Sequence, residues 1–158
     1  MGLILKNALR KFIVGFPTVS DKYNVRGATL AASSAACAFG DAVKYASGFF
    51  SKLSTVTAAS DFAGFIVGTN VKLADWPTNA VTVKAGEAFN LLVSGYIAVE
   101  LDADAVLANC VPATPVYITS AGKITTVSTS NTALPKLHFT GEAELQGTAK
   151  IAEIYVEA

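Results

Sequence analysis

The amino-acid sequence predicts a mainly β protein, a small barrel or sandwich domain that follows an extended N-terminal arm. Apolar side chains fall at every second position along residues 89–101, which is the spacing of a strand with one buried face. Elsewhere, short apolar runs are separated by Gly, Pro and Asn, as in barrels and sandwiches built from short strands. We therefore expect the arm over residues 1–38 and the β-domain over residues 39–158.

The first 38 residues differ from the rest in charge and in pattern. Residues 1–30 contain five basic residues and one acidic residue, a net charge of +4, so the remainder of this neutral chain sums to −4. An apolar stripe over residues 3–16 permits a short amphipathic helix, which the following proline would end. Residues 17–30 show no period and are expected to be irregular. Residues 28–38 are expected to form either a short helix or a linker.

The β-domain is expected to contain several short strands and one long strand. The long strand covers residues 89–101, and Gly95 within it indicates a bulge or a bend. Residues 116–119 and 124–127 flank a Ser-Ala-Gly-Lys turn and predict a hairpin. Further strands are expected over residues 42–46, 53–58, 62–68, 80–84 and 148–157, with a turn over 75–79 and a polar loop over 128–132.

The composition narrows the possible functions. Hydrophobic residues make up 52% of the chain and charged residues only 15%, so it has the composition of a folded domain rather than of a disordered tail. The net charge of zero argues against a protein that binds nucleic acid. With one histidine, the chain cannot form a metal or hydrolase site that is built on several histidines. Basic residues interrupt the apolar N-terminus, which fits neither a secretory signal nor a membrane span. A sparsely charged surface suits contact with other protein, and a cytosolic origin is expected.

Few residues carry the pattern of a catalytic or metal site. His138 has apolar neighbours and is expected to pack on a strand face. Asp102 and Asp104 form a carboxylate pair that suits acid–base work or a cation, but the other ligands of a calcium loop are missing. That pair and a second one, at residues 142 and 144, are expected to be solvated. The two cysteines have small apolar neighbours and are expected to be buried free thiols. We therefore predict no enzyme activity, no cofactor and no metal.

The order of short sequence strings along the β-domain indicates a family. The strings are FGDAV at 39–43, DFAGFIVG at 61–68, VKAGEAF at 83–89, VSGYIAV at 93–99 and PVYI at 115–118, followed by Gly122, a 141–147 segment and a closing strand at 151–156. This order resembles that of the small cement (head decoration) proteins of tailed bacteriophages. The resemblance implies a compact β-domain on the outside of the capsid, often a trimer, that ties neighbouring major-capsid subunits together. Residues 1–38 have no counterpart in it.

The N-terminal residues are expected to bind the partner. Phe12 and Phe16 would anchor in a groove, and Lys6, Arg10 and Lys11 around them would suit an acidic surface. The full set of expected partner-binding residues is Leu5, Lys6, Arg10, Lys11, Phe12, Phe16, Tyr23 and Arg26. The expected partners are the major capsid protein and further copies of this chain in a homotrimer, with no nucleic acid and no membrane. The expected location is the exterior of the virion, after assembly in the host cytoplasm.

Two other functions are compatible with the sequence. The first is a protein that binds a membrane surface through its basic amphipathic N-terminus. The second is a small β-barrel that binds a ligand or acts as an enzyme, through His138 or the carboxylates of Asp102 and Asp104.

Overall fold

The computed structural model describes residues 14–18, 23–53, 61–68 and 82–158. Its strands are β1 (Asn24–Thr29), β2 (Cys37–Ala38), β3 (Ala42–Ala46), β4 (Phe49–Lys52), β5 (Phe62–Val67), β6 (Thr82–Val83), β7 (Ala88–Glu100), β8 (Pro115–Ile118), β9 (Ile124–Thr125), β10 (Thr132–Gln146) and β11 (Ala149–Val156). A short 3-10 helix, η3 (Leu107–Asn109), lies between β7 and β8. The predicted mainly β class is therefore confirmed.

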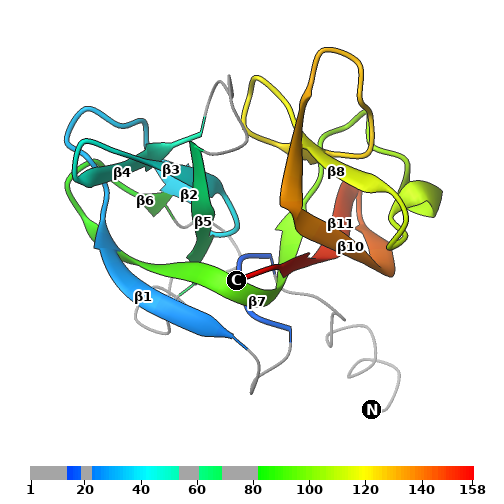
Figure 1. The fold of residues 1–158 in the computed structure, drawn as a ribbon, viewed down its shortest axis with the longest axis horizontal. Coiled ribbons are helices and arrows are strands. Elements are labelled where there is room, and N and C mark those ends of the chain that lie inside the picture. The colour runs from blue at the N-terminus through cyan, green and yellow to red at the C-terminus, as the bar shows by residue number, and fades with distance from the viewer. Residues whose placement is uncertain (1–13, 19–22, 54–60, 69–81) are drawn as a thin grey trace.

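Strand β7 runs through both halves of the molecule (Figure 1). Its first part pairs with β1 on one edge and with β5 on the other. Its second part, from Gly95 onward, pairs with β11. Gly95 has a φ of 120°, a backbone conformation that favours glycine, and it stands where β7 changes partners. The bend that the sequence indicates at this glycine is the passage of β7 from one half to the other.

Each half of the nine-stranded sheet curls back on itself. The order is β4-β3-β5-β7-β11-β10-β8-β9, with β1 joined to β7, and β2 and β6 form a separate pair. In the first half, a bridge between Leu30 and Phe50 brings the end of β1 to β4. In the second half, a bridge between Leu101 and Ile124 brings β9 back to the end of β7. The result is two small barrel-like halves that share one long strand.

Two large apolar clusters fill these halves, and a third, small one consists of Ala98 and Ile151, with Val14 packed against them. The larger one takes Phe65 and Leu92 from the first half and Ile97, Phe139 and Ile154 from the second, so one core passes beneath β7 and joins both halves. The smaller cluster lies in the first half, among the side chains of Leu30, Cys37, Val43, Ile66, Val83, Phe89 and Leu91. The alternating burial along β7 follows from the period of two that the sequence displays.

Several of the expected elements agree with the structure. The strands expected at 42–46, 62–68, 89–101, 116–119 and 148–157 correspond to β3, β5, β7, β8 and β11. The hairpin turn before β9 is closed by the Gly122 amide, which donates to the Thr119 carbonyl over 2.9 Å. The short β6 lies inside the strand expected at 80–84. The turn expected at 75–79 and residues 54–58 lie outside the described residues, and so does most of the helix expected at 3–16.

Other expectations were wrong or incomplete. Residues 24–29 form strand β1 rather than irregular chain. Their backbone pairs with β7, although their side chains do not alternate as in a typical strand. Residues 31–36 form turns and loop ahead of β2, without a helix. The long β10 was not expected, since Pro135 and Gly141 interrupt its pattern. The strand after the Ser47-Gly48 turn is β4, which precedes the one expected at 53–58. The division at residue 38 stays a prediction.

Candidate interaction surface

The eight residues expected to bind a partner fall into two groups. Leu5, Lys6, Arg10, Lys11 and Phe12 lie outside the described residues. Phe16, Tyr23 and Arg26 are described, and they lie apart: Phe16 is beside the second part of β7, the exposed Tyr23 directly precedes β1, and Arg26 is within β1.

Residues 14–18 are held along the second part of β7. The amide of Gly15 donates to the Ala98 carbonyl over 2.8 Å, and the amide of Thr18 donates to the Tyr96 carbonyl over 3.1 Å. In the other direction, the Ala98 amide donates to the Phe16 carbonyl over 3.3 Å. This part of β7 therefore has β11 on one edge and residues 14–18 on the other. Residues 14–18 are therefore fixed on the body of the molecule.

The ring of Phe16 packs within the chain. It lies edge-on to the ring of Phe39, with centroids 6.1 Å apart, and its far end lies against Gly68. The Gly68 amide also donates to the Gly15 carbonyl over 2.7 Å. This packing gives Phe16 a structural role in holding residues 14–18, and its role toward a partner stays a prediction.

Substituting Gly15 by alanine is expected to loosen this attachment. Gly15 has a φ of 78°, and an added Cβ would meet the backbone of Phe39 and Gly40. A non-glycine residue in this conformation costs about 1–3 kcal/mol before the clash is counted. Native-state hydrogen exchange should therefore show faster exchange at the Gly15 and Thr18 amides.

The matched control is Gly27→Ala. Gly27 lies in β1 without a positive φ, and an added Cβ would have nothing within 4 Å. We expect its stability to stay within about 0.5 kcal/mol of the parent, as is usual for surface substitutions. Equal exchange rates in the two variants would contradict the described attachment.

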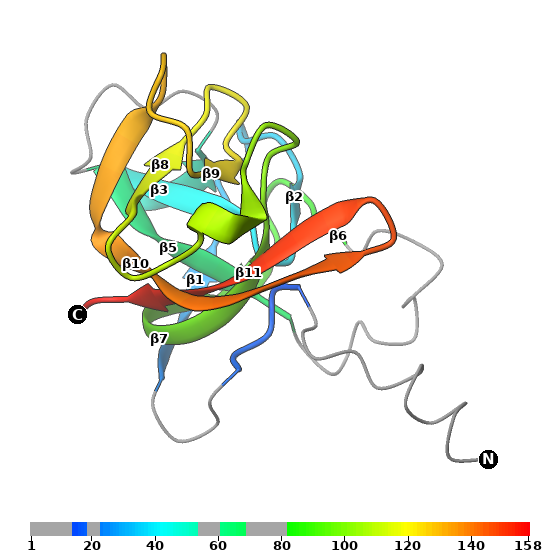
Figure 2. The ribbon, with the colours of Figure 1, turned by 90° about the vertical axis from the view of Figure 1, so that its right-hand side faces the viewer.

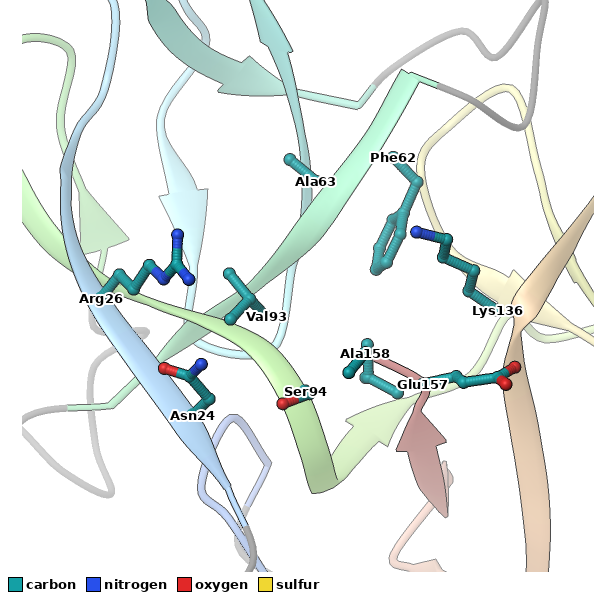
Figure 3. Close-up of a pocket in the computed structure, with 10 residues that line it drawn as sticks. Asn24, Arg26, Phe62, Ala63, Val93, Ser94, Lys136, Glu157 and Ala158 are labelled. Atoms are coloured by element: carbon teal, nitrogen blue, oxygen red, sulfur yellow. The ribbon is translucent and has the colours of Figure 1, made fainter.

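Arg26 lines an open pocket of about 290 Å³ between the two halves (Figure 3). Arg26 projects from β1 on one side, Lys136 projects from β10 on the other, and Phe62 and Val93 lie between them. We call this the basic pocket; its lining is Asn24, Arg26, Phe62, Ala63, Val93, Ser94, Lys136, Val156, Glu157 and Ala158. Its volume is at the low end of the range for small-molecule sites, about 300–1,000 Å³. A single protein side chain suits it better than a large ligand.

Two of the three charged side chains that line the basic pocket are positive. Arg26 and Lys136 are both exposed and make no ion pair with any residue that the structure describes. Glu157 carries the opposite charge, but its carboxylate lies 3.3 Å from Nε2 of His138 and points away from Arg26. The pocket therefore combines an apolar floor with two cations that are available to an acidic partner. The sequence singled out Arg26 but gave no signal for Lys136, because β10 was not expected.

Large apolar side chains are exposed at three further places. Tyr45 and Phe49 flank the turn between β3 and β4, and Phe49 is 56% exposed. Val106 and Val111 lie on either side of η3. Leu145, which is 60% exposed, lies at the end of β10. The sequence gives no sign that these side chains are exposed, because they are of the same types as the core side chains and differ only in where the fold places them.

The residues considered for chemistry have ordinary structural environments. His138 lies on a face of β10 beside Tyr155, with ring centroids 6.2 Å apart, as a strand-face histidine. Asp104 accepts a 2.6 Å hydrogen bond from the hydroxyl of Thr125, and Asp102 accepts one from the Asp104 amide. Among the described residues, no group of three His, Cys, Asp or Glu side chains is placed to hold a metal ion.

The two cysteines are free and buried. Burial raises the pKa of the Cys37 thiol to about 11, and the carboxylate of Asp41 adds to the shift. Burial likewise raises the pKa of Cys110 to about 11, against a smaller opposing effect of the Lys150 ammonium. A thiolate is the nucleophilic form, so both thiols are unreactive in the folded chain at neutral pH.

These thiols predict a loss of stability at alkaline pH. In the unfolded chain they ionise near 9.0, whereas in the folded chain they stay protonated to about 11. The stability that this difference gives the folded chain is fully present below pH 9 and is lost as the pH rises from 9 toward 11. In that window the unfolded chain has released the thiol protons that the folded chain still holds, so the free energy of unfolding falls. The slope of unfolding free energy against pH in this window should be steeper in the parent than in the double variant Cys37→Ala, Cys110→Ala. Equal slopes would contradict the burial of the thiols.

In the described part of the chain, no helix has both the length and the apolar character needed to cross a membrane.

Comparisons with known proteins bear on the fold and on the family. A search of curated proteins gives no match. A solved structure titled "The capsid of Myoviridae Phage XM1" contains a chain of similar fold, with a TM-score of 0.69 and 15% sequence identity, and the match covers 94% of this chain and 92% of that one. A family model described as structural cement protein (E217 gp24/Pam3 gp6) matches residues 6–155. The chain therefore belongs to the family of phage structural cement proteins, which gives it a structural role in the virion.

Proposed function

We propose that this protein binds the outer surface of a phage capsid and ties neighbouring major-capsid subunits together, without catalysis. The observation that carries the proposal is the family match over residues 6–155, which includes most of the N-terminal segment as well as the β-domain. A chain of similar fold is present in a solved phage capsid, which supports the proposal that this fold serves in a capsid.

The physical properties of the chain suit this role. A protein that repeats many times on one shell needs only modest affinity at each contact, because contacts on the same particle act together. The body offers separate exposed apolar groups, such as Phe49 and Leu145, and the basic pocket at a third place. The net charge of +4 over residues 1–30 suits an acidic region of the shell.

We also propose that the protein acts as a homotrimer. A chain with a net charge of zero has little long-range repulsion between copies, which favours association. Light scattering on the purified full chain measures the mass directly. A mass of three chains supports the trimer, and a mass of one chain at every concentration refutes it.

Particle stability tests the cementing role. Shells that lack this protein are heated with and without the purified chain, and release of the packaged or encapsulated content is followed. The proposal predicts that the added chain binds the shells and raises the temperature of release. Binding without any effect on that temperature would reject cementing, and no binding would reject the whole proposal.

A further inference from the structure

We propose that the basic pocket binds an extended acidic segment of the major capsid protein, with an apolar side chain of that segment on the pocket floor and its carboxylates at Arg26 and Lys136. This inference rests on the proposed function and deepens it, since it gives the contact a place on the β-domain and gives the partner segment a chemistry. The contact is additional to the one expected of residues 1–13.

The basic pocket gathers polar side chains that have no partner within the described chain. The guanidinium of Arg26 and the ammonium of Lys136 make no ion pair with a described carboxylate. The side chains of Asn24 and Ser94 also line the pocket, and neither makes a hydrogen bond to another described residue. These four side chains come from β1, β7 and β10, so the fold brings together donors that are far apart in the sequence.

Apolar side chains form the floor between the two cations. Phe62 and Val93 lie between Arg26 and Lys136 (Figure 3). Phe62 is only partly buried, and its ring packs against the fully buried ring of Phe65, with centroids 5.2 Å apart. The floor is therefore anchored to the core and still offers surface against which a partner's apolar side chain can be buried.

This lining favours carboxylates at its rim. A guanidinium binds a carboxylate through two parallel hydrogen bonds, and hydrogen bonds between ionised groups are stronger than those between neutral ones. Among the described lining residues, the carboxylate side chain is that of Glu157, which lies 3.3 Å from Nε2 of His138 and points away from Arg26. An incoming carboxylate therefore meets two cations whose charge is not already paired.

A second copy of this chain has few free carboxylates to offer to the pocket. Eight of the ten described carboxylates already have a partner within the chain: Asp41, Glu87, Asp102, Asp104, Glu142, Glu144, Glu153 and Glu157. The other two, Asp61 and Glu100, lie in different parts of the fold, before β5 and at the end of β7. The family match supports the shell as the source of the acidic segment instead.

The arrangement of the lining predicts a pattern in the segment that it binds. Arg26 and Lys136 stand on opposite sides of the floor, so the segment should place one carboxylate on each side of an apolar residue. In an extended segment, residues two positions apart share a face. The expected pattern is therefore acidic, any, apolar, any, acidic. Charge pairing at both ends would fix the register of the segment in the pocket.

Zero-length crosslinking on loaded shells tests the contact. Empty shells with the full chain bound are treated with a carbodiimide, which joins a lysine amine directly to a carboxylate that touches it, and the joined peptides are identified by mass spectrometry. We expect a junction between Lys136 and an aspartate or glutamate of the major capsid protein, within the pattern above. Lys136→Arg is the matched variant, since it keeps the charge but lacks the amine; it should bind shells as the parent does and give no junction at this position.

Charge reversal measures how much the contact contributes. Co-sedimentation with empty shells gives the affinity of the parent, of Lys136→Glu, of Arg26→Glu with Lys136→Glu, and of Lys84→Glu. The double variant should bind roughly 30-fold or more weakly, because it opposes like charges at the contact. Lys84 is an exposed lysine outside the described lining, so Lys84→Glu should bind as the parent does. Circular dichroism checks that each variant is folded.

Several results would overturn the inference and leave the cementing proposal standing. They are parent-like shell binding by the double variant, equal losses in Lys136→Glu and Lys84→Glu, or junctions to the shell that do not include Lys136. A junction between Lys136 and a second copy would identify this chain as the occupant and would overturn the inference as well. Failure of the parent to bind shells would instead reject the proposed function, and this inference with it.

Discussion

Replacing Phe65 by alanine is expected to lower the free energy of unfolding by about 3–5 kcal/mol, the usual cost of removing a buried aromatic ring from a core. Phe65 is fully buried on β5 and belongs to the cluster that joins both halves beneath β7. Its ring also packs against Phe62, with centroids 5.2 Å apart. Total stabilities of about 5–15 kcal/mol are typical, so this one change removes a large share. For a chain of this length the expected drop in melting temperature is roughly 6–20 °C.

The same substitution at Phe49 is the matched control. Phe49 is 56% exposed at the turn between β3 and β4, so its removal should change the unfolding free energy by about 1 kcal/mol or less. Chemical denaturation of the dilute protein measures both variants. Equal losses for the two phenylalanines would contradict the single core that passes beneath β7.

Removing residues 1–13 is expected to abolish shell binding and to leave the fold intact. The shortened chain keeps the hydrogen bonds that hold Gly15, Phe16 and Thr18 on β7. It loses Leu5, Phe12 and the three cations at positions 6, 10 and 11, the residues proposed as anchors. Loss of such anchors should weaken binding to empty shells by at least about 100-fold, with a change in melting temperature of only a few degrees.

Two substitution sets divide this effect into its parts. Phe12→Ala in the full chain removes an apolar anchor, and Lys6→Glu with Arg10→Glu and Lys11→Glu reverses the charge. Salt should weaken binding of the parent and strengthen any remaining binding of the charge variant, because salt screens attraction and repulsion between exposed charges alike. Full binding by the shortened chain would assign the contact to the body. Binding of the full chain to lipid vesicles would instead favour the membrane-surface alternative.

The long strand and its bend could be predicted from the sequence, because the pattern that indicates them is also the pattern of burial in the fold. The period of two in residues 89–101 appears as alternating burial along β7, and Gly95 stands where the strand changes partners. The buried state of Cys37 and Cys110 also follows from their small apolar neighbours. Such features are local, so the sequence displays them directly.

Other parts of the fold depend on contacts between distant residues and leave little local signal. β1 exists because β7 offers it an edge, and its own residues alternate poorly. β10 carries Pro135 and Gly141, and its register with β11 shifts between Phe139 and Ala143, which interrupts the period. Lys136 joins Arg26 at the basic pocket only because β10 lies across from β1 in space. No spacing in the sequence connects these two residues.

Cryo-electron microscopy of assembled particles that contain this chain tests the central claim most directly. The account predicts density for the β-domain on the outside of the shell, across the boundary between neighbouring major-capsid subunits, with the N-terminal residues in contact with the shell. Density inside the shell, density confined to a single capsid subunit, or the absence of this chain from the particle would contradict it.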